Sequence, residues 1–242
     1  MVIPIINPIA FPMKTSRLFL CLTALAVFTH LGSPARAAVV VTSPDFPPIG
    51  ESFIATPGSV LTFFGGGGLT ITVSNLILRV DSLIVRSHIG PDETDNFNAT
   101  LLGDLSVNGS PTVPVSSSGP STAILTGKWG NTTGTFDTEM LQLDLSGGSP
   151  FGPFMIRESP TKQSTGKTTI TNLGGGGYKI DSFFDVFTEL SIDGGASWMP
   201  QSVGGGPNPV HFDLGGAVPE PTALGLLGLS LLGALRRSRR VA

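Results

Sequence analysis

The alternation of apolar and polar residues between positions 38 and 217 predicts strands, and no stretch of this part has the spacing of a helix. The clearest strand covers residues 97–107, where every second residue is apolar or glycine and most of the others are polar. The dipeptide Asn108-Gly109 follows it and favours a two-residue hairpin turn. We therefore expect a half-buried antiparallel strand with one face in solvent.

Two other runs keep the alternation but change the parity of their apolar residues. In residues 69–80 the change falls near Ser74-Asn75, and in residues 136–145 it falls between Met140 and Leu141, which is grouped with Leu143. A β-bulge accommodates such a slip, because one extra residue restores the buried face. Residues 180–192 predict the longest strand. Its apolar face comprises Ile180, Phe184, Val186, Leu190 and Ile192.

Glycine- and proline-rich segments separate these runs, as expected for turns between short strands. The pattern predicts an all-β fold, an antiparallel β-sandwich-like single domain that covers residues 38–217. Two tetraglycine runs, at 65–68 and 174–177, each precede a strand-like run. We interpret them as hairpin loops, and the alternative is a duplicated half-domain.

The N-terminal segment has the design of a secretory signal peptide. Lys14 and Arg17 precede the apolar residues 18–28, and Ala35 and Ala37 form an A-x-A cleavage site. We expect translation to start at Met13, because residues 1–12 fit no signal design. The single cysteine lies inside the apolar segment, so the mature chain is expected to have no disulfide and no thiolate metal site.

The C-terminal segment combines three elements in a fixed order. They are the extended tetrapeptide Val218, Pro219, Glu220 and Pro221, then the uncharged segment 223–235, then Arg236, Arg237, Arg239 and Arg240. The uncharged segment predicts a short apolar helix, which falls short of the ~20 residues that span a bilayer. The arginines form a stop on the cytoplasmic side, since cytoplasmic flanks favour positive charge.

These three elements resemble the PEP-CTERM protein-sorting tail. The resemblance implies recognition by an exosortase-type enzyme of a Gram-negative-type bacterium, cleavage near the Pro-Glu-Pro motif and only a transient stay in the inner membrane. It also implies delivery to the cell surface or the exopolysaccharide matrix. The alternative is an ordinary C-terminal transmembrane helix with a positive flank.

Three segments of the predicted domain resemble segments that recur in exported bacterial surface proteins of unassigned function. They are residues 136–141, 158–161 and 181–198. This resemblance implies no catalytic residue. It agrees with the export signals at the two ends of the chain.

The predicted domain is acidic once the charged ends of the chain are set aside. Residues 38–217 contain seven Lys and Arg and sixteen Asp and Glu, which gives a net charge of about −9. Phosphate contacts depend on Lys and Arg, so this charge argues against nucleic acid as a partner.

Calcium is the cofactor that the acidic residues suggest, and no other cofactor is expected. Ca²⁺ takes oxygen ligands from carboxylates on flexible loops. Asp92, Glu93 and Asp95 form the densest acidic cluster, and Asp193 begins a second glycine-containing loop. The alternative is that these carboxylates keep solvated loops soluble.

Signals for catalysis are weak. Residues 164–169 echo the end of a phosphate-binding loop but lack its first glycine, so we interpret them as a polar hairpin loop. His88 and His211 have no G-x-S-x-G motif beside them and are interpreted as surface or turn histidines. Trp129 and Trp198 suggest a sugar-stacking platform, although the preferred interpretation is that each is buried in the core.

Two functions remain open at this point. The favoured one is a non-catalytic structural or adhesive protein of the cell surface or matrix. The alternative is a secreted carbohydrate-binding or carbohydrate-active protein. A cleft lined by aromatic side chains, with two carboxyl groups ~5–10 Å apart, would support a carbohydrate-active enzyme.

Overall fold

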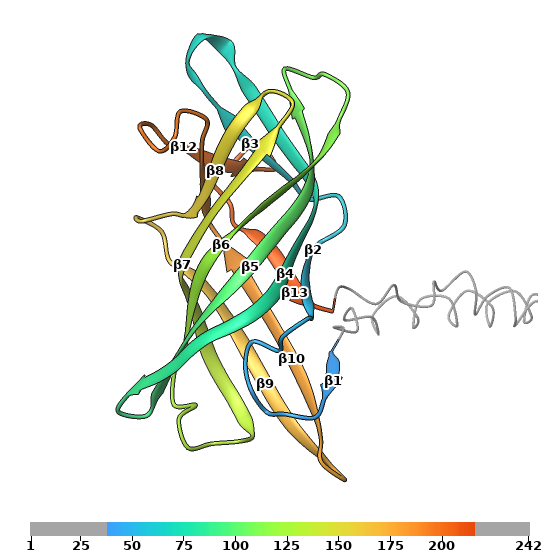
Figure 1. Ribbon diagram of the computed structural model, residues 1–242, viewed down its shortest axis with the longest axis vertical. Helices are drawn as coiled ribbons and strands as arrows, with labels where there is room; N and C mark the ends of the chain where they lie inside the picture. The colour runs from blue at the N-terminus through green and yellow to red at the C-terminus, as the bar shows by residue number, and fades with distance from the viewer. Residues whose placement is uncertain (1–37, 216–242) are drawn as a thin grey trace, which may run out of the picture. The chain divides into compact units, whose positions relative to one another are not determined.

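The computed structural model describes residues 38–215, which we call the body (Figure 1). The predicted signal peptide and the sorting tail lie outside the described residues. The body contains a 13-stranded sheet and one short 3₁₀ turn. In chain order these elements are β1 (Val39–Val41), β2 (Ser52–Ala55), β3 (Val60–Phe64), η2 (Gly66–Gly68), β4 (Thr70–Ile89), β5 (Asp92–Val107), β6 (Val113–Leu125), β7 (Gly134–Ser149), β8 (Gly152–Glu158), β9 (Ser164–Gly174), β10 (Gly177–Val186), β11 (Thr188–Ser191), β12 (Met199–Val203) and β13 (Val210–Leu214).

All strand pairs in the body are antiparallel, and they connect into one sheet that closes on itself. The long strands β4, β5, β6 and β7 lie side by side in chain order (Figure 1). One half of the sheet closes from β7 through β8, β11, β12 and β3 to β4. The other half closes through β9, β10, β13 and β2. The prediction of an all-β antiparallel fold is confirmed. Where a sandwich has two separate sheets, here all thirteen strands belong to one hydrogen-bonded sheet.

The apolar core lies inside this closed sheet and is formed by the inward face of the strands. Phe46, from the connection between β1 and β2, is fully buried. Its ring centroid lies 6.3 Å from that of Phe53 and 6.1 Å from that of Phe184. The paired strands and the buried core both lie within residues 38–215, so the body has a sheet and a core of its own. It contains no helix with the length and apolar character of a membrane span.

The strand predicted at 97–107 forms the second part of β5, and its inward face is buried from Phe97 to Leu105, whereas Val107 is half-buried. Thr100 and Ser106, on the face expected in solvent, are buried as well. Asn108 and Gly109 follow with φ of 50° and 73°. Positive φ at both central residues is typical of a type I′ hairpin turn. The backbone N–H of Ser110 closes the turn on the carbonyl of Val107 at 2.9 Å.

Both predicted changes of parity coincide with irregular pairing. The register between β4 and β5 shifts between Ser74 and Ile77, and Asn75 there has a φ of 52°. In β7 the register shifts near Leu141. Leu141 is 47% exposed, so grouping it with the buried Leu143 was wrong. Leu141 is the extra residue of the bulge, and the buried face resumes after it.

The long strand predicted at 180–192 is two strands, because β10 ends at Val186 and β11 begins at Thr188. Ile192 follows β11 and is exposed, so its placement on the buried face was wrong. Connections also interrupt the neighbouring positions of the sheet, between β8 and β9 and between β12 and β13. The residue between β10 and β11, Phe187, still bonds across the break: its carbonyl accepts from Ser159 N and its N–H donates to Ser164 Oγ.

One buried side chain supplies hydrogen bonds that the interrupted strands lack. Gln201 of β12 is 4% exposed. Its Oε1 accepts from the N–H and the hydroxyl of Thr188 at 2.7 and 2.6 Å. Its Nε2 donates to the carbonyls of Val186 at 3.1 Å and Asn208 at 2.8 Å. Gln201 therefore satisfies buried backbone groups where the regular ladder stops.

The tetraglycine runs connect paired strands, β3 with β4 and β9 with β10. Their interpretation as hairpin loops is confirmed. Residues 164–169 lie in strand β9, so their interpretation as a polar loop was wrong. A Cβ on Gly166 would overlap the carbonyl oxygen of Phe183, so this glycine allows close packing of two paired strands.

Candidate functional site

A cluster of charged side chains lies inside one end of the closed sheet. Arg86 of β4 pairs with Asp95 of β5 in the strand register, and both face inward. The Nε of Arg86 lies 2.7 Å from Asp95 Oδ1 and 3.3 Å from Glu93 Oε1. Its Nη1 lies 2.6 Å from Asp45 Oδ1, and its Nη2 donates to the carbonyl of Phe46 at 3.0 Å. Arg86 therefore ties the connection between β1 and β2 to the inner wall of the sheet.

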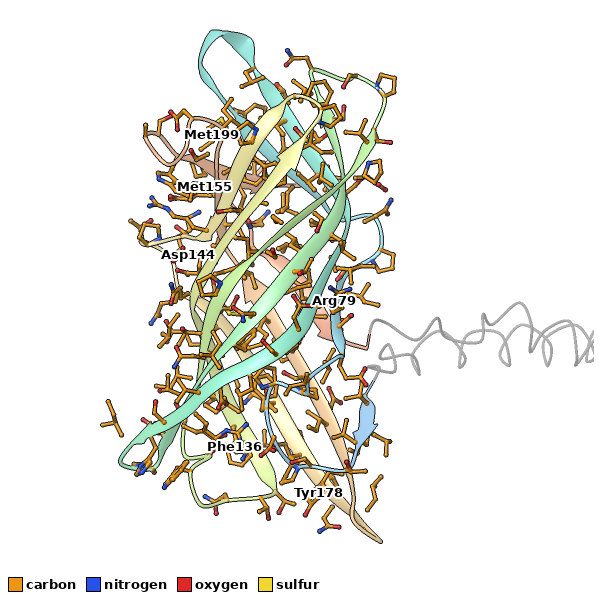
Figure 2. The ribbon with its side chains drawn as sticks, in the orientation of Figure 1. Arg79, Phe136, Asp144, Met155, Tyr178 and Met199 are labelled. Carbon is orange, nitrogen blue, oxygen red and sulfur yellow. The ribbon has the colours of Figure 1, made fainter. Side chains whose placement is uncertain are left out.

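Lys128 completes this cluster from the connection between β6 and β7. It is 5% exposed, its Nζ lies 3.6 Å from Glu93 Oε1, and it lies 5.9 Å from the ring centroid of Phe136. Figure 2 shows Phe136 at this end of the sheet, and Met155 and Met199 at the other end. Buried charged groups are tolerated only where they are paired, because desolvation is costly, and here each carboxylate has a cationic neighbour.

Burial has a further effect on Asp95, which is fully inaccessible to solvent. Desolvation raises the pKa of Asp95 to about 7, and the neighbouring Glu93 raises it too, while Arg86 acts in the opposite direction. A cavity of about 390 Å³ lies beside the cluster, and Arg86, Asp45, Leu83 and Ile49 contribute to its lining.

The structure separates the four predicted calcium ligands. Asp92, Glu93 and Asp95 begin strand β5, so their assignment to a flexible loop was wrong. Asp92 Oδ1 accepts from the backbone N–H of Gly127 at 2.8 Å. Asp193 follows Ser191 of β11, which pairs with Met155 at the opposite end of the sheet (Figure 2). In the body, no three or more His, Cys, Asp or Glu side chains are placed to hold a metal ion. Calcium binding stays a prediction that calcium titration tests.

Asp193 organises its own turn. Its carboxylate accepts from the N–H of Ser197 at 2.9 Å and from the hydroxyl of Ser191 at 2.7 Å. These bonds, above all those from Ser197, lower the pKa of Asp193 to about 2. This carboxylate therefore stabilises the turn between β11 and β12.

The two histidines of the body have different surroundings. His211 is half-buried, with Nδ1 at 2.7 Å from Asp185 Oδ1 and Nε2 at 3.3 Å from Asp213 Oδ1. His88 is exposed, and its ring stacks on Trp129 with 3.9 Å between centroids and 11° between planes. The interpretation of His88 as a surface histidine is confirmed, whereas His211 joins β13 to β10 through Asp185.

Neither tryptophan is buried in the core, so that interpretation was wrong. Trp129 is 41% exposed. Trp198 is half-buried, its Nε1 donates to the carbonyl of Gly195 at 3.1 Å, and the guanidinium of Arg157 lies 4.0 Å from its ring centroid. Both residues lie in turns between strands, where the alternation that buries core residues does not operate.

Glu158 was not predicted as a site residue from the sequence. It is the last residue of β8, before the connection to β9. A cavity of about 290 Å³ there is lined by Glu139, Glu158 and the residues up to Gln163, with no aromatic side chain. Burial raises the pKa of Glu158 to about 7; the carboxylates of Glu139 and Glu189 add to this, and a hydrogen bond from Ser164 opposes it. These acids come from three different strands, β7, β8 and β11, so no local motif could have revealed them.

The C-terminal segment matches a known protein family model. Residues 217–240 match the family model described as the PEP-CTERM protein-sorting motif. The chain carries a PEP-CTERM sorting motif. The match covers the predicted tetrapeptide 218–221 and the arginines at 236–240, which lie outside the described residues, as do Ala35 and Ala37. No curated protein and no solved structure matches the chain.

A PEP-CTERM motif marks a protein for export and for sorting by an exosortase-type enzyme. The motif belongs to the tail and assigns no specific role to the body.

Proposed function

We propose that the PEP-CTERM protein acts at the cell surface or in the exopolysaccharide matrix, in a non-catalytic structural or adhesive role. The observation that carries this proposal is the sorting motif at residues 217–240, directly after the body. An exosortase-type enzyme cleaves the chain near the Pro-Glu-Pro sequence and releases the body from its transient hold in the inner membrane.

The contacts of the body support a structural role for its charged residues. Arg86 and Lys128 bond to carboxylates within the fold, and Arg157 binds Glu189 of the neighbouring strand at 2.7 Å. These bonds fix strands and connections to one another. The cavity that contains both Glu139 and Glu158 lacks the aromatic lining expected of a glycosidase cleft.

Mass spectrometry of the cell-associated protein tests the proposed processing. We expect the mature chain to begin after Ala37 and to end near residues 218–221. In cells without exosortase activity the chain should extend to Arg240. An intact C-terminus in wild-type cells would refute cleavage at this motif.

A matched pair of variants tests the motif itself. Replacing Pro219 and Pro221 with alanine should block cleavage, because the segment loses the geometry that keeps it extended. The control is Pro207→Ala, an exposed proline of the body, which should leave cleavage unchanged. Equal processing of both variants would contradict recognition through the Pro-Glu-Pro sequence.

A further inference from the structure

Trp129 is a large aromatic side chain held at the surface of the body. It is 41% exposed, and its indole Nε1 has no hydrogen-bond partner among the described residues. Trp198 differs in both respects, since Arg157 covers its ring and its Nε1 is bonded. An exposed tryptophan offers a ligand both an apolar ring face and an N–H donor, and tryptophan is enriched in binding surfaces for this reason.

The backbone around Trp129 is fixed by several hydrogen bonds. The N–H of Trp129 donates to the carbonyl of Pro91 at 2.8 Å, which joins this connection to the turn between β4 and β5. The N–H of Gly127 donates to Asp92 Oδ1 at 2.8 Å, and the side chain of Asn131 donates to the carbonyl of Gly127 at 2.9 Å. The backbone that carries the indole is therefore held in place, which lowers the entropy that a ligand must overcome.

His88 supplies the second part of this surface. Its ring lies parallel to the indole at 3.9 Å. Its Nδ1 lies 3.2 Å from the carbonyl of Gly90, and a carbonyl only accepts, so Nδ1 carries the proton of this hydrogen bond. In the neutral ring Nε2 is then an acceptor, and it has no partner among the described residues. The stacked rings thus offer one free donor and one free acceptor.

The charges next to the rings favour an uncharged ligand. Glu93 and Lys128 lie beside this surface in the fold, but both are buried and lie close to each other, and Arg86 also approaches Glu93. The exposed residues that follow Trp129 are the polar Asn131, Thr132 and Thr133. An ionic ligand finds no free counter-charge in this set, whereas hydroxyl groups find donors and acceptors.

From this geometry we infer that the Trp129–His88 surface binds a neutral saccharide. The C–H face of a sugar ring packs against the exposed indole, and its hydroxyl groups bond to Trp129 Nε1, His88 Nε2 and the neighbouring polar side chains. The inference rests on the proposed surface role, because it names the class of matrix molecule that the body holds. No bond is made or broken.

Fluorescence titration of the purified body tests this inference. The chain has two tryptophans, so Trp198→Phe leaves Trp129 as the single reporter. The probes are cellohexaose, maltohexaose, mannohexaose and chitohexaose, with hexagalacturonic acid as the anionic comparison. We expect at least one neutral probe to change the Trp129 emission in a saturable way. Calorimetry measures the same binding with the wild-type body.

Variants then assign the binding to the surface. Trp129→Ala should weaken binding by about tenfold or more, whereas Trp198→Ala should leave it unchanged. His88→Phe keeps the stacking but lacks Nε2, so it should retain part of the affinity that His88→Ala loses. Circular dichroism of each variant shows whether it folds.

Several results would overturn the inference. They are no binding of any neutral probe, equal affinity of Trp129→Ala, and preferential salt-sensitive binding of hexagalacturonic acid. A Trp129-dependent dimer without saccharide would assign the surface to a second copy of the chain instead. Mass spectrometry of the C-terminus is independent of these assays, so an exported and processed body that binds no saccharide would sink this inference alone.

Discussion

Gln201 gives the sharpest test of how the interrupted sheet is held together. Gln201→Met keeps the length of the side chain and removes all four of its hydrogen bonds. The N–H of Thr188 and the carbonyl of Val186 then lose a partner in the interior. Each such bond contributes about 0.5–1.5 kcal/mol net, and each buried group left unpaired costs about 1–3 kcal/mol. Apolar burial of the methionine offsets part of this loss.

We therefore expect Gln201→Met to lower the free energy of unfolding of the body by about 3–5 kcal/mol, a large share of the ~5–15 kcal/mol typical of a domain. For a chain of this size the melting temperature should fall by about 10 °C. Urea titration followed by far-UV circular dichroism measures the change. The slope against urea should stay constant, because the native surface does not change.

The matched control is Gln163→Met, at an exposed glutamine in the connection between β8 and β9. Its effect should stay within about 0.5 kcal/mol. Gln201→Glu should also destabilise the body at neutral pH, since a carboxylate cannot donate to the carbonyls of Val186 and Asn208. A loss below about 1 kcal/mol for Gln201→Met would refute the role assigned to these bonds.

Three further predictions use the same unfolding assay. Arg86→Met should lower the free energy of unfolding by about 3–5 kcal/mol, because buried carboxylates lose their cation. The control Arg79→Met, at an exposed ion pair, should lower it by less than about 1 kcal/mol. The pKa values of Asp95 and Glu158 in the folded state are about 7 and exceed those in the unfolded state. The folded state therefore binds more protons between about pH 4 and pH 7, and the free energy of unfolding should fall as pH rises through that range. A urea midpoint that rises from pH 5 to pH 8 would contradict this prediction. Gly166→Ala should lower the free energy of unfolding by about 1–3 kcal/mol, because the added Cβ overlaps the β10 backbone. The control is Gly148→Ala, where a Cβ meets open space. Equal stability of the two variants would disprove the close packing at Gly166.

The sequence by itself determined the local features of the body. Alternation identified the buried face of β5, because side chains of a strand point to opposite sides in turn. A parity change located the bulge at Asn75, and Asn108-Gly109 located a turn that needs positive φ at both residues. The sorting motif was readable for the same reason, since its three elements follow one another directly in the chain.

Local pattern was insufficient where acidic residues enter a strand. Asp92, Glu93 and Asp95 look like a solvated loop in sequence, yet Glu93 and Asp95 share the inward parity of Phe97. A carboxylate on that face is tolerable only with a cation beside it, and that cation, Arg86, comes from another strand. The sequence contains both residues but does not show that they meet.

Tertiary structure alone decided how the sheet closes and where its surface can bind. The pairs of β3 with β12 and of β2 with β13 join strands far apart in the chain, and any of several strands could offer the same alternating backbone groups. Closure depends on which partners leave the fewest buried groups unsatisfied, as Gln201 illustrates. Likewise Trp129 and His88 are neighbours only because the end of β4 meets the connection between β6 and β7. Local sequence sets the direction of each side chain, whereas contacts between distant residues depend on the free energy of the whole fold.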